Sequence, residues 1–239
     1  SQGGGVELNT REGTITNSTI SGNQATNGGG GVLYLIFCGF GPGHREMTFT
    51  NNTITANTTT TANNGAVQLL NFCDSTSITL NLQNTLVANN PGGNFKNVAS
   101  SLLSLGNNLD SDGSSAFVNG VAGNLVGNAQ TPLDARLAPL GNYGGRTQTH
   151  ALLCGSPALN TGSNAAAAAA GLTTDQRGSV RQVNGAVDIG AFENHLTINA
   201  SLPNAAANAP YHQTLTATGG TGNKAFTLLG GTLPTGLLL

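Results

Sequence analysis

The chain has 239 residues, of which 8% are charged and 38% are hydrophobic, and its net charge is −2. A nearly neutral chain without clustered Lys and Arg excludes a nucleic-acid-binding protein, which needs a basic stripe to replace phosphate counterions. No apolar run approaches the roughly 18 residues of a membrane span, and the hydrophobic content at low charge excludes a disordered chain.

A short phrase of the type Asn-Thr-Ile recurs along the first half of the chain. Its aliphatic residue is Ile20 in the first copy, and later copies place Ile54, Leu86 and Leu109 there, at offsets of 34, 32 and 23 residues. Such repeats stack one supersecondary unit on the next. Because no helix-length amphipathic segment separates the short strands, βαβ folds are excluded, and an all-β parallel β-helix is predicted for residues 1–193.

Equivalent residues of successive turns are expected to stack into columns. The internal aliphatic column would consist of Ile20, Ile54, Leu86 and Leu109. Corners carry amides, because Asn tolerates left-handed backbone angles and stacked amides can bond along a ladder. Two structural ladders are predicted: one of Asn23, Asn57, Asn89 and Asp112, and one of Asn52, Asn84 and Asn107, with Ser18 at its end. The alternative is a set of polar corner residues without any role.

Three cysteines are present, and two of them follow matching strands. Cys38 and Cys73 are 35 residues apart, so neighbouring turns would bring them within one strand spacing of about 4.8 Å. That spacing allows a disulfide, and two stacked buried thiols are the alternative. Cys154 has no visible partner.

The phrases after residue 105 occur in a recognisable order. They are Gly106-Asn107-Asn108-Leu109-Asp110-Ser111-Asp112-Gly113, Leu137-Ala138-Pro139-Leu140-Gly141-Asn142-Tyr143-Gly144-Gly145, Gly155-Ser156-Pro157-Ala158-Leu159-Asn160-Thr161-Gly162, Thr174-Asp175-Gln176-Arg177-Gly178 and Asp188-Ile189-Gly190-Ala191-Phe192-Glu193. This series resembles the choice-of-anchor Q family of bacterial surface and secreted proteins. The resemblance implies a right-handed parallel β-helix like that of pectate lyases, with residues 132–193 as its terminal, capping segment. Alanines 165–170 depart from the family pattern, and a loop with at most one helical turn is expected there, capped by Ser163 or Asn164.

Residues 194–239 resemble the opening of a bacterial immunoglobulin-like repeat of the putative-Ig type. The resemblance implies an incomplete β-sandwich module, which cannot bury its own face. We expect it to be completed by further chain or by another subunit. The opening Ser1-Gln2-Gly3-Gly4-Gly5 resembles the middle of a repeat, so a mature fragment or an excerpt of a longer chain is expected.

The densest charges lie in the last part of the predicted coil. They are Asp175, Arg177, Arg181, Asp188 and Glu193. We expect structural ion pairs that fasten the last turn of the coil, with Arg177 or Arg181 bridging Asp188 bidentately. An active site is the alternative.

Acidic residues in the turns are few, and catalytic residues are not predicted among them. The candidates are Glu7, Glu12, Glu46, Asp74, Asp110 and Asp112, and no two are expected in register with Arg or Lys beside them. His44-Arg45-Glu46 is expected in a solvated loop. Asp110 and Asp112 are weak calcium candidates, because the phrase lacks the downstream acidic ligand of a calcium loop. The four histidines lack zinc-ligand spacing, and no other cofactor is expected.

The sequence favours a non-catalytic, extracellular or cell-surface β-solenoid with a structural or adhesive role. It would be a subunit of a filament or surface layer assembled head to tail, and its partners would be further copies, the rest of a longer chain or a cell-surface polysaccharide. The alternative is a polysaccharide lyase or glycoside hydrolase acting on acidic polysaccharide. A carbohydrate-binding module is disfavoured, because the chain has no Trp and only three tyrosines, Tyr34, Tyr143 and Tyr211.

Overall fold

The computed structural model describes residues 3–37, 43–60, 64–73, 76–96, 102–199, 202–206 and 209–219, together with 226, 228, 231–233, 235 and 236. The chain divides into two compact units, Ser1–Asn194 and His195–Leu239. In the described part of the chain, no helix is long and apolar enough to cross a membrane.

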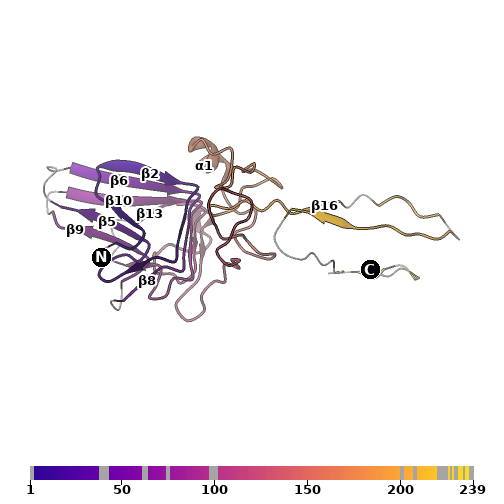
Figure 1. Cartoon of the computed structure of the whole chain (residues 1–239), viewed down its shortest axis with the longest axis horizontal. Coiled ribbons are helices and arrows are strands. Elements are labelled where there is room, and N and C mark those ends of the chain that lie inside the picture. Colours follow the sequence, from indigo (N-terminus) through magenta and orange to yellow (C-terminus); the bar gives the residue numbers. More distant parts are fainter. Residues whose placement is uncertain are drawn as a thin grey trace. The chain divides into compact units, whose positions relative to one another are not determined.

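The first unit is built from three parallel sheets that the chain visits in turn (Figure 1). The first sheet contains β1 (Val6–Leu8), β5 (Val32–Ile36), β9 (Val67–Asn71) and β12 (Phe95–Lys96). The second contains β2 (Glu12–Thr16), β6 (Gly43–Thr50), β10 (Thr76–Gln83) and β13 (Leu102–Gly106). The third contains β3 (Thr19–Ser21), β7 (Thr53–Thr55), β11 (Leu86–Ala88), β14 (Leu109–Asp110) and β15 (Leu125–Val126). The short strands β4 (Gln24–Ala25) and β8 (Thr58–Thr59) also pair in parallel.

Each strand pairs with the strand of the next turn, as β2 does with β6 and β6 with β10. The prediction of an all-β chain with parallel strands is confirmed, and the arrangement is compatible with a solenoid.

Inward-pointing side chains of the three sheets form one continuous core. It includes Val32, Phe49, Ile54, Leu80 and Val87, all at most 1% exposed. Successive side chains of a strand point to opposite faces of the sheet, so every second residue of each strand reaches this core.

The aliphatic column differs from the predicted one by a shift of one residue. Ile20 pairs with Ile54 and Ile54 with Val87, so Val87 occupies the internal position. Leu86 pairs with Thr53 and with Leu109. In a strand a shift of one residue moves a side chain to the other face, so Leu86 and Leu109 lie on the outer face of the third sheet.

The last turn of the core is covered by the chain between β14 and β15. Phe117 from this stretch packs against the core, and the Phe95 amide donates to Ser114 Oγ at 2.9 Å. A short 3-10 helix, Val121–Gly123, follows before β15.

Residues 132–194, which we call the strap, pack against the outer face of the third sheet (Figure 1). Leu86 and Leu109 lie under strap residues such as Leu152, Ile189 and Phe192. The capping segment therefore covers the side of the coil, whereas the prediction placed it at the last turn. The apolar outer face of β11 and β14 is the physical reason, because it has to be buried.

The strap contains the helix α1 (Asn164–Ala169), which is longer than the expected single turn. Ser163 is its N-cap and accepts a hydrogen bond from the Ala166 amide at 3.2 Å. Burial of Ala166 and Ala167 supplies the tertiary packing that a short alanine run lacks in isolation.

In the second unit, β16 (Thr197–Asn199) and β17 (Thr216–Thr218) form an antiparallel pair. The immunoglobulin-like module stays a prediction.

Candidate functional site

A column of asparagines joins the coil to the strap. The first residue of each corner before the third sheet is an Asn with a positive φ: Asn17 (47°), Asn51 (55°), Asn84 (48°) and Asn107 (52°). This left-handed conformation is one that Asn adopts more readily than most residues, and it turns the side chain outward.

Each of these four amide groups donates to a backbone carbonyl of the strap. Asn17 Nδ2 reaches Thr174 O at 2.6 Å, and Asn51 Nδ2 reaches Asp188 O at 3.2 Å. Asn84 and Asn107 reach Ser163 O and Thr161 O, both at 2.9 Å. The strap is therefore bound side-on to four successive turns.

The second residue of each corner points inward and forms the ladder that the prediction assigned to Asn52, Asn84 and Asn107. The backbone amide of Ser18 donates to Asn52 Oδ1 at 3.0 Å, and that of Thr85 donates to Asn108 Oδ1 at 3.0 Å. The members of this inner ladder are Ser18, Asn52, Thr85, Asn108 and Asn124. Asn84 and Asn107 are one residue earlier and belong to the outer column, so that prediction was wrong for both.

The ladder at the corner after the third sheet also differs by one residue from the prediction. Asn57 Oδ1 accepts from the Asn23 amide at 3.1 Å, and Asn90 Oδ1 accepts from the Asn57 amide at 2.9 Å. Asn90 thus takes the place predicted for Asn89, which is exposed and has a φ of 56°. Asp112 ends the ladder as predicted, but through Asn94: Asn94 Oδ1 accepts from Asn90 Nδ2 at 2.9 Å, and Asp112 Oδ2 accepts from the Asn94 amide at 2.8 Å.

Hydroxyl groups on the outer face of β3 extend the seam between coil and strap. Thr19 Oγ1 lies 2.7 Å from Thr149 Oγ1, and Ser21 Oγ lies 2.7 Å from Nε2 of His150. His150 Nδ1 faces the Ala138 carbonyl at 2.8 Å. Since a carbonyl only accepts, Nδ1 carries the proton and Nε2 accepts from Ser21. Burial lowers the pKa of His150, so the seam contains a neutral imidazole.

The Asp-Gln-Arg-Gly phrase forms a tight, fully bonded turn in the strap. Asp175 Oδ1 accepts from the amides of Arg177 and Ser179 at 2.9 and 3.1 Å, and Oδ2 accepts from the Glu193 amide at 3.0 Å. Arg177 Nη2 lies 2.6 Å from Asp175 Oδ2, and its guanidinium stacks 3.7 Å from the centre of the Phe192 ring. Arg177 therefore pairs with Asp175, where the prediction gave Asp188 as the partner.

Both carboxylate oxygens of Asp188 accept backbone hydrogen bonds, from Asn160 at 2.7 Å and from Asn194 at 2.6 Å. The acid nearest to Arg181 is Glu193, with Nη1 and Oε2 3.9 Å apart. Burial, with the negative charge of Asp188 as a second cause, raises the pKa of Glu193 from 4.5 to about 8. The two oxygens of Asp188 are therefore occupied by backbone amides of the turns at Asn160 and Asn194.

The weak calcium candidates lie at the end of the coil and accept protein hydrogen bonds. Asp110 Oδ1 accepts from Asn94 Nδ2 at 2.7 Å, and its Oδ2 accepts from the Ser115 amide at 2.8 Å. Burial raises the pKa of Asp110. Asp112 Oδ1 accepts from the Ser114 amide at 3.0 Å. Among the residues that the structure describes, no cluster of three or more His, Cys, Asp or Glu could hold a metal ion.

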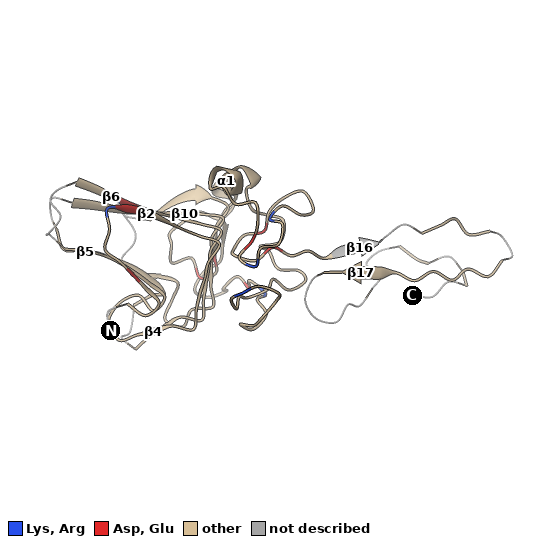
Figure 2. Cartoon of the chain, turned by 45° about the horizontal axis from the view of Figure 1, so that its top comes forward, with Lys and Arg blue, Asp and Glu red and all other residues tan. Residues whose placement is uncertain are grey.

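Two acidic residues lie in register on the outer face of the second sheet, while Arg45, between His44 and Glu46 in the sequence, is buried. Glu12 of β2 pairs with Glu46 of β6, so the strand spacing places their Cα atoms about 4.8 Å apart. His44, expected in a loop, belongs to β6 as well. Asn81 Nδ2 donates to Glu46 Oε1. Figure 2 shows charged residues at this β2–β6 edge and a second group within the strap.

The cysteine prediction falls partly outside the described residues. Cys73 is disulfide-bonded, and Cys154 is a free, exposed cysteine. Cys38 is not among the described residues, so the pair Cys38–Cys73 stays a prediction. Asp74, one of the acidic residues considered above, also lies outside the described residues.

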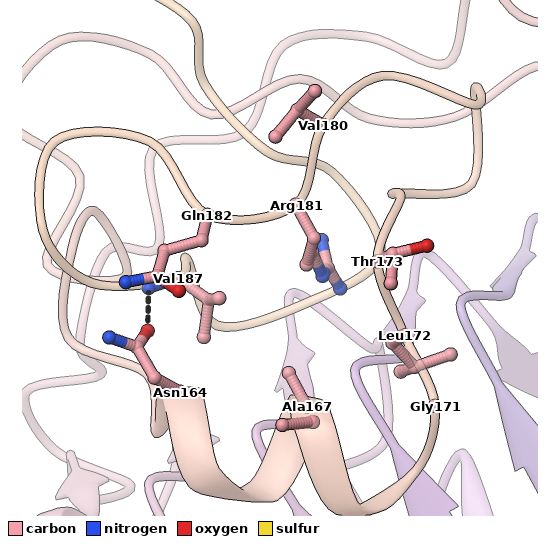
Figure 3. A pocket seen from close by; sticks show the side chains of 10 residues that line it. Asn164, Ala167, Gly171, Leu172, Thr173, Val180, Arg181, Gln182 and Val187 are labelled. Atoms are coloured by element: carbon pink, nitrogen blue, oxygen red, sulfur yellow. Dashed lines mark hydrogen bonds between the residues drawn. The ribbon is translucent and has the colours of Figure 1, made fainter.

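A pocket of about 360 Å³ opens in the strap between α1 and the loops at 171–173 and 180–182 (Figure 3). One wall is closed by a hydrogen bond from the Val187 amide to Asn164 Oδ1 at 2.9 Å. Arg181 also lines the pocket.

Comparisons with protein-family models, with curated proteins and with solved structures gave no match to this chain. The resemblance to choice-of-anchor Q proteins therefore stays a prediction.

Raising the pH from 6.5 to 8.5 is expected to destabilise the first unit through Glu193. The pKa of Glu193 in the folded protein, about 8, is above its ordinary value of 4.5. The stabilisation that comes from its protonated form is therefore complete below pH 4.5 and is lost as the pH rises through 8. The free energy of unfolding should fall by at most about 1.4 kcal/mol per pH unit. The pKa of His150 is lowered from its ordinary value of 6.5, so His150 destabilises the fold only when the pH falls below 6.5. It therefore does not contribute to a loss of stability above pH 6.5.

Urea unfolding across this pH range measures the effect, with Glu193→Gln as the comparison. The variant should show a flatter profile above pH 6.5. An equal slope in both proteins would assign the titration to another group.

Proposed function

We propose that the chain is a non-catalytic, right-handed β-solenoid with a structural or adhesive role outside the cell, and that its second unit begins an immunoglobulin-like module. The observation that carries the proposal is the strap, which the outer asparagine column binds side-on to four turns. Parallel strands of a coil separate turn by turn when pulled along its axis, since each turn contacts only its neighbours. A strap that bridges the turns shares the force among them, as a stalk or surface-layer component requires.

The low charge and the bonded carboxylates of the strap support the same role. Asp175 and Asp188 use both oxygens on backbone amides, and Arg177 is held by Asp175. A general acid or base needs a carboxyl group that can reach a substrate proton. This arrangement favours a scaffold over an active site.

Pulling single molecules of the full chain along the coil axis tests the structural role. The first unit is expected to unfold in one cooperative step, because the strap links the turns. Stepwise unfolding at low force, one turn at a time, would contradict it. Electron microscopy at rising concentration tests head-to-tail assembly, and only dispersed single particles would count against that part of the proposal.

A polysaccharide-active enzyme is the second candidate, and the in-register pair Glu12 and Glu46 favours it. Glycosidases that retain configuration use two neighbouring carboxyl groups, about 5 Å apart, and Glu12 and Glu46 leave the same face of two neighbouring strands. Release of oligosaccharides from acidic polysaccharides, with and without calcium, would support this activity if Glu12→Gln and Glu46→Gln abolished it. Glu7→Gln on β1 is the control, because Glu7 lies on a different sheet.

A further inference from the structure

Ser21 and His150 form a hydroxyl–imidazole pair at the seam between β3 and the strap. Ser21 Oγ lies 2.7 Å from His150 Nε2, and His150 Nδ1 lies 2.8 Å from the carbonyl oxygen of Ala138. The carbonyl fixes the proton on Nδ1, so Nε2 directs its lone pair at the Ser21 hydroxyl. A hydroxyl nucleophile, a base within hydrogen-bond reach and a third group that orients the base are the parts of an activated serine.

The imidazole is in the protonation state that a base requires. His150 is 8% exposed, and burial lowers its pKa from the ordinary value of 6.5. It is therefore neutral at neutral pH and accepts a proton when the Ser21 hydroxyl attacks. The Ala138 carbonyl takes the orienting role that a carboxylate has in the Ser-His-Asp arrangement.

Ser21 lies on an open edge of the third sheet, from which a substrate can approach. β3 is the last strand in the order β15-β14-β11-β7-β3, so in the described part of the chain no strand pairs with its other edge. Ser21 itself is partly exposed. Beside it, a Cβ added at Gly22 would meet no atom of the described residues within 4 Å. The space next to the Ser21 hydroxyl is therefore open on the side away from β7.

The same edge supplies a hydrogen-bond donor for the oxygen of an attacked carbonyl group. The Gly22 amide points towards β7 and donates to the Thr55 carbonyl at 3.4 Å. Successive backbone amides of a strand point to opposite edges, so the Ser21 amide points to the open edge, where a strand presents unpaired N–H groups. A backbone amide beside the nucleophile stabilises the negative charge that develops on the carbonyl oxygen.

We propose that Ser21 is an acylation site, which takes the acyl group of an activated carboxylic ester with His150 as the base. Ser21 Oγ attacks the carbonyl carbon of the ester, and its proton passes to His150 Nε2. The bond between this carbon and the alcohol oxygen then breaks, and the alcohol leaves with the proton. The product is an acyl group esterified to Ser21.

The orienting group sets the substrate class. A carbonyl stabilises the imidazolium less than a carboxylate does, so esters with a good leaving group, and not amides, are the expected acyl donors. Acylation adds a group to the scaffold, so this inference goes beyond the structural role proposed above and does not depend on it.

The probe is p-nitrophenyl acetate, added to the full chain with the substitution Cys154→Ser so that the exposed thiol does not react. Peptide mass spectrometry is expected to find an acetyl group on Ser21, and Ser21→Ala should abolish this label. Ser18→Ala is the matched control and should leave the label unchanged, because the Ser18 hydroxyl donates to the Thr16 carbonyl at 2.7 Å. An unlabelled Ser21, or loss of the label in Ser18→Ala as well, would overturn the proposal.

Two further substitutions separate reactivity from stability, with circular dichroism to verify the fold. His150→Asn keeps a donor for the Ala138 carbonyl but has no basic nitrogen, and it should slow the acetylation of Ser21 about 100-fold or more. Ser21→Cys should be acetylated faster than Ser21, because a thiol beside an imidazole is more easily deprotonated. An unchanged rate in His150→Asn, or no label in Ser21→Cys, would show that the pair is a structural hydrogen bond only.

Discussion

Replacing Asn84 by alanine is expected to lower the free energy of unfolding of the first unit by about 4 kcal/mol. Asn84 is fully buried between β10 and the strap. Its Nδ2 donates to Ser163 O at 2.9 Å, and its Oδ1 accepts from the Ser163 amide at 2.8 Å. Nδ2 also donates to Asn51 Oδ1 at 3.2 Å. Alanine loses these three bonds at about 1 kcal/mol each and adds a left-handed backbone cost of about 1 kcal/mol.

Asn89→Ala is the matched control for this prediction. Asn89 has a similar φ, 56° against 48° for Asn84, but its side chain is exposed. The backbone cost of alanine is therefore common to both variants, and Asn89→Ala should cost only about 1 kcal/mol. The difference of about 3 kcal/mol measures the attachment of the strap.

Urea unfolding followed by circular dichroism gives both values, and hydrogen exchange locates the effect. The Ser163 amide should exchange faster in Asn84→Ala and normally in Asn89→Ala. Equal destabilisation by the two substitutions would mean that Asn84 does not hold the strap.

The sequence predicts much of the coil, because alternation and turn residues are local signals. Strands, corners and the inward position of Ile20 and Ile54 follow from the period-2 pattern and the Asn-rich turns. The pattern fails where the period drifts. Leu86 and Val87 are both aliphatic, so hydrophobicity alone does not decide which of them points inward, and the pairing of Ile54 with Val87 does.

A local signal for the outer column was present in the sequence. Each corner before the third sheet carries a pair of polar residues, such as Asn51-Asn52 and Asn107-Asn108. In the structure the first member adopts positive φ and turns outward, while the second bonds inward. A positive φ at the first residue makes the two neighbouring side chains leave the chain on opposite sides. A pair of adjacent polar residues, more than a single Asn, therefore marks a corner of this kind.

The position of the strap could not be predicted in this way. Asn17 and Thr174 are 157 residues apart, and the acceptor is a backbone carbonyl that any residue supplies. The same applies to Ser21 and His150, 129 residues apart. The sequence shows the group of charged residues between Asp175 and Glu193. Which of them form pairs depends on the turn at Asp175, because this turn brings Arg177 next to the Asp175 carboxylate.

Arg177→Met is expected to destabilise the first unit by about 3–5 kcal/mol, the cost of breaking a buried ion pair by removing one partner. The side chain of Asp175 is fully buried and that of Arg177 is 11% exposed. The guanidinium also donates to the carbonyls of Glu193 at 2.6 Å and Tyr143 at 3.2 Å, and it stacks on Phe192. Methionine keeps the aliphatic length but leaves the carboxylate and both carbonyls without this donor.

Arg136→Met is the comparison, because the chain offers a second Arg–Asp pair two residues apart at the surface. Arg136 and Asp134 are separated by 4.0 Å, with side chains 53% and 75% exposed. Exposed pairs contribute about 0–1 kcal/mol, so this variant should unfold close to the wild type in urea. If both substitutions had the same small effect, the network at Asp175 would not hold the strap together. If Arg177→Met alone is destabilising and Asp175→Asn partly restores stability in the double variant, the cost comes from the uncompensated carboxylate, as expected for a buried pair.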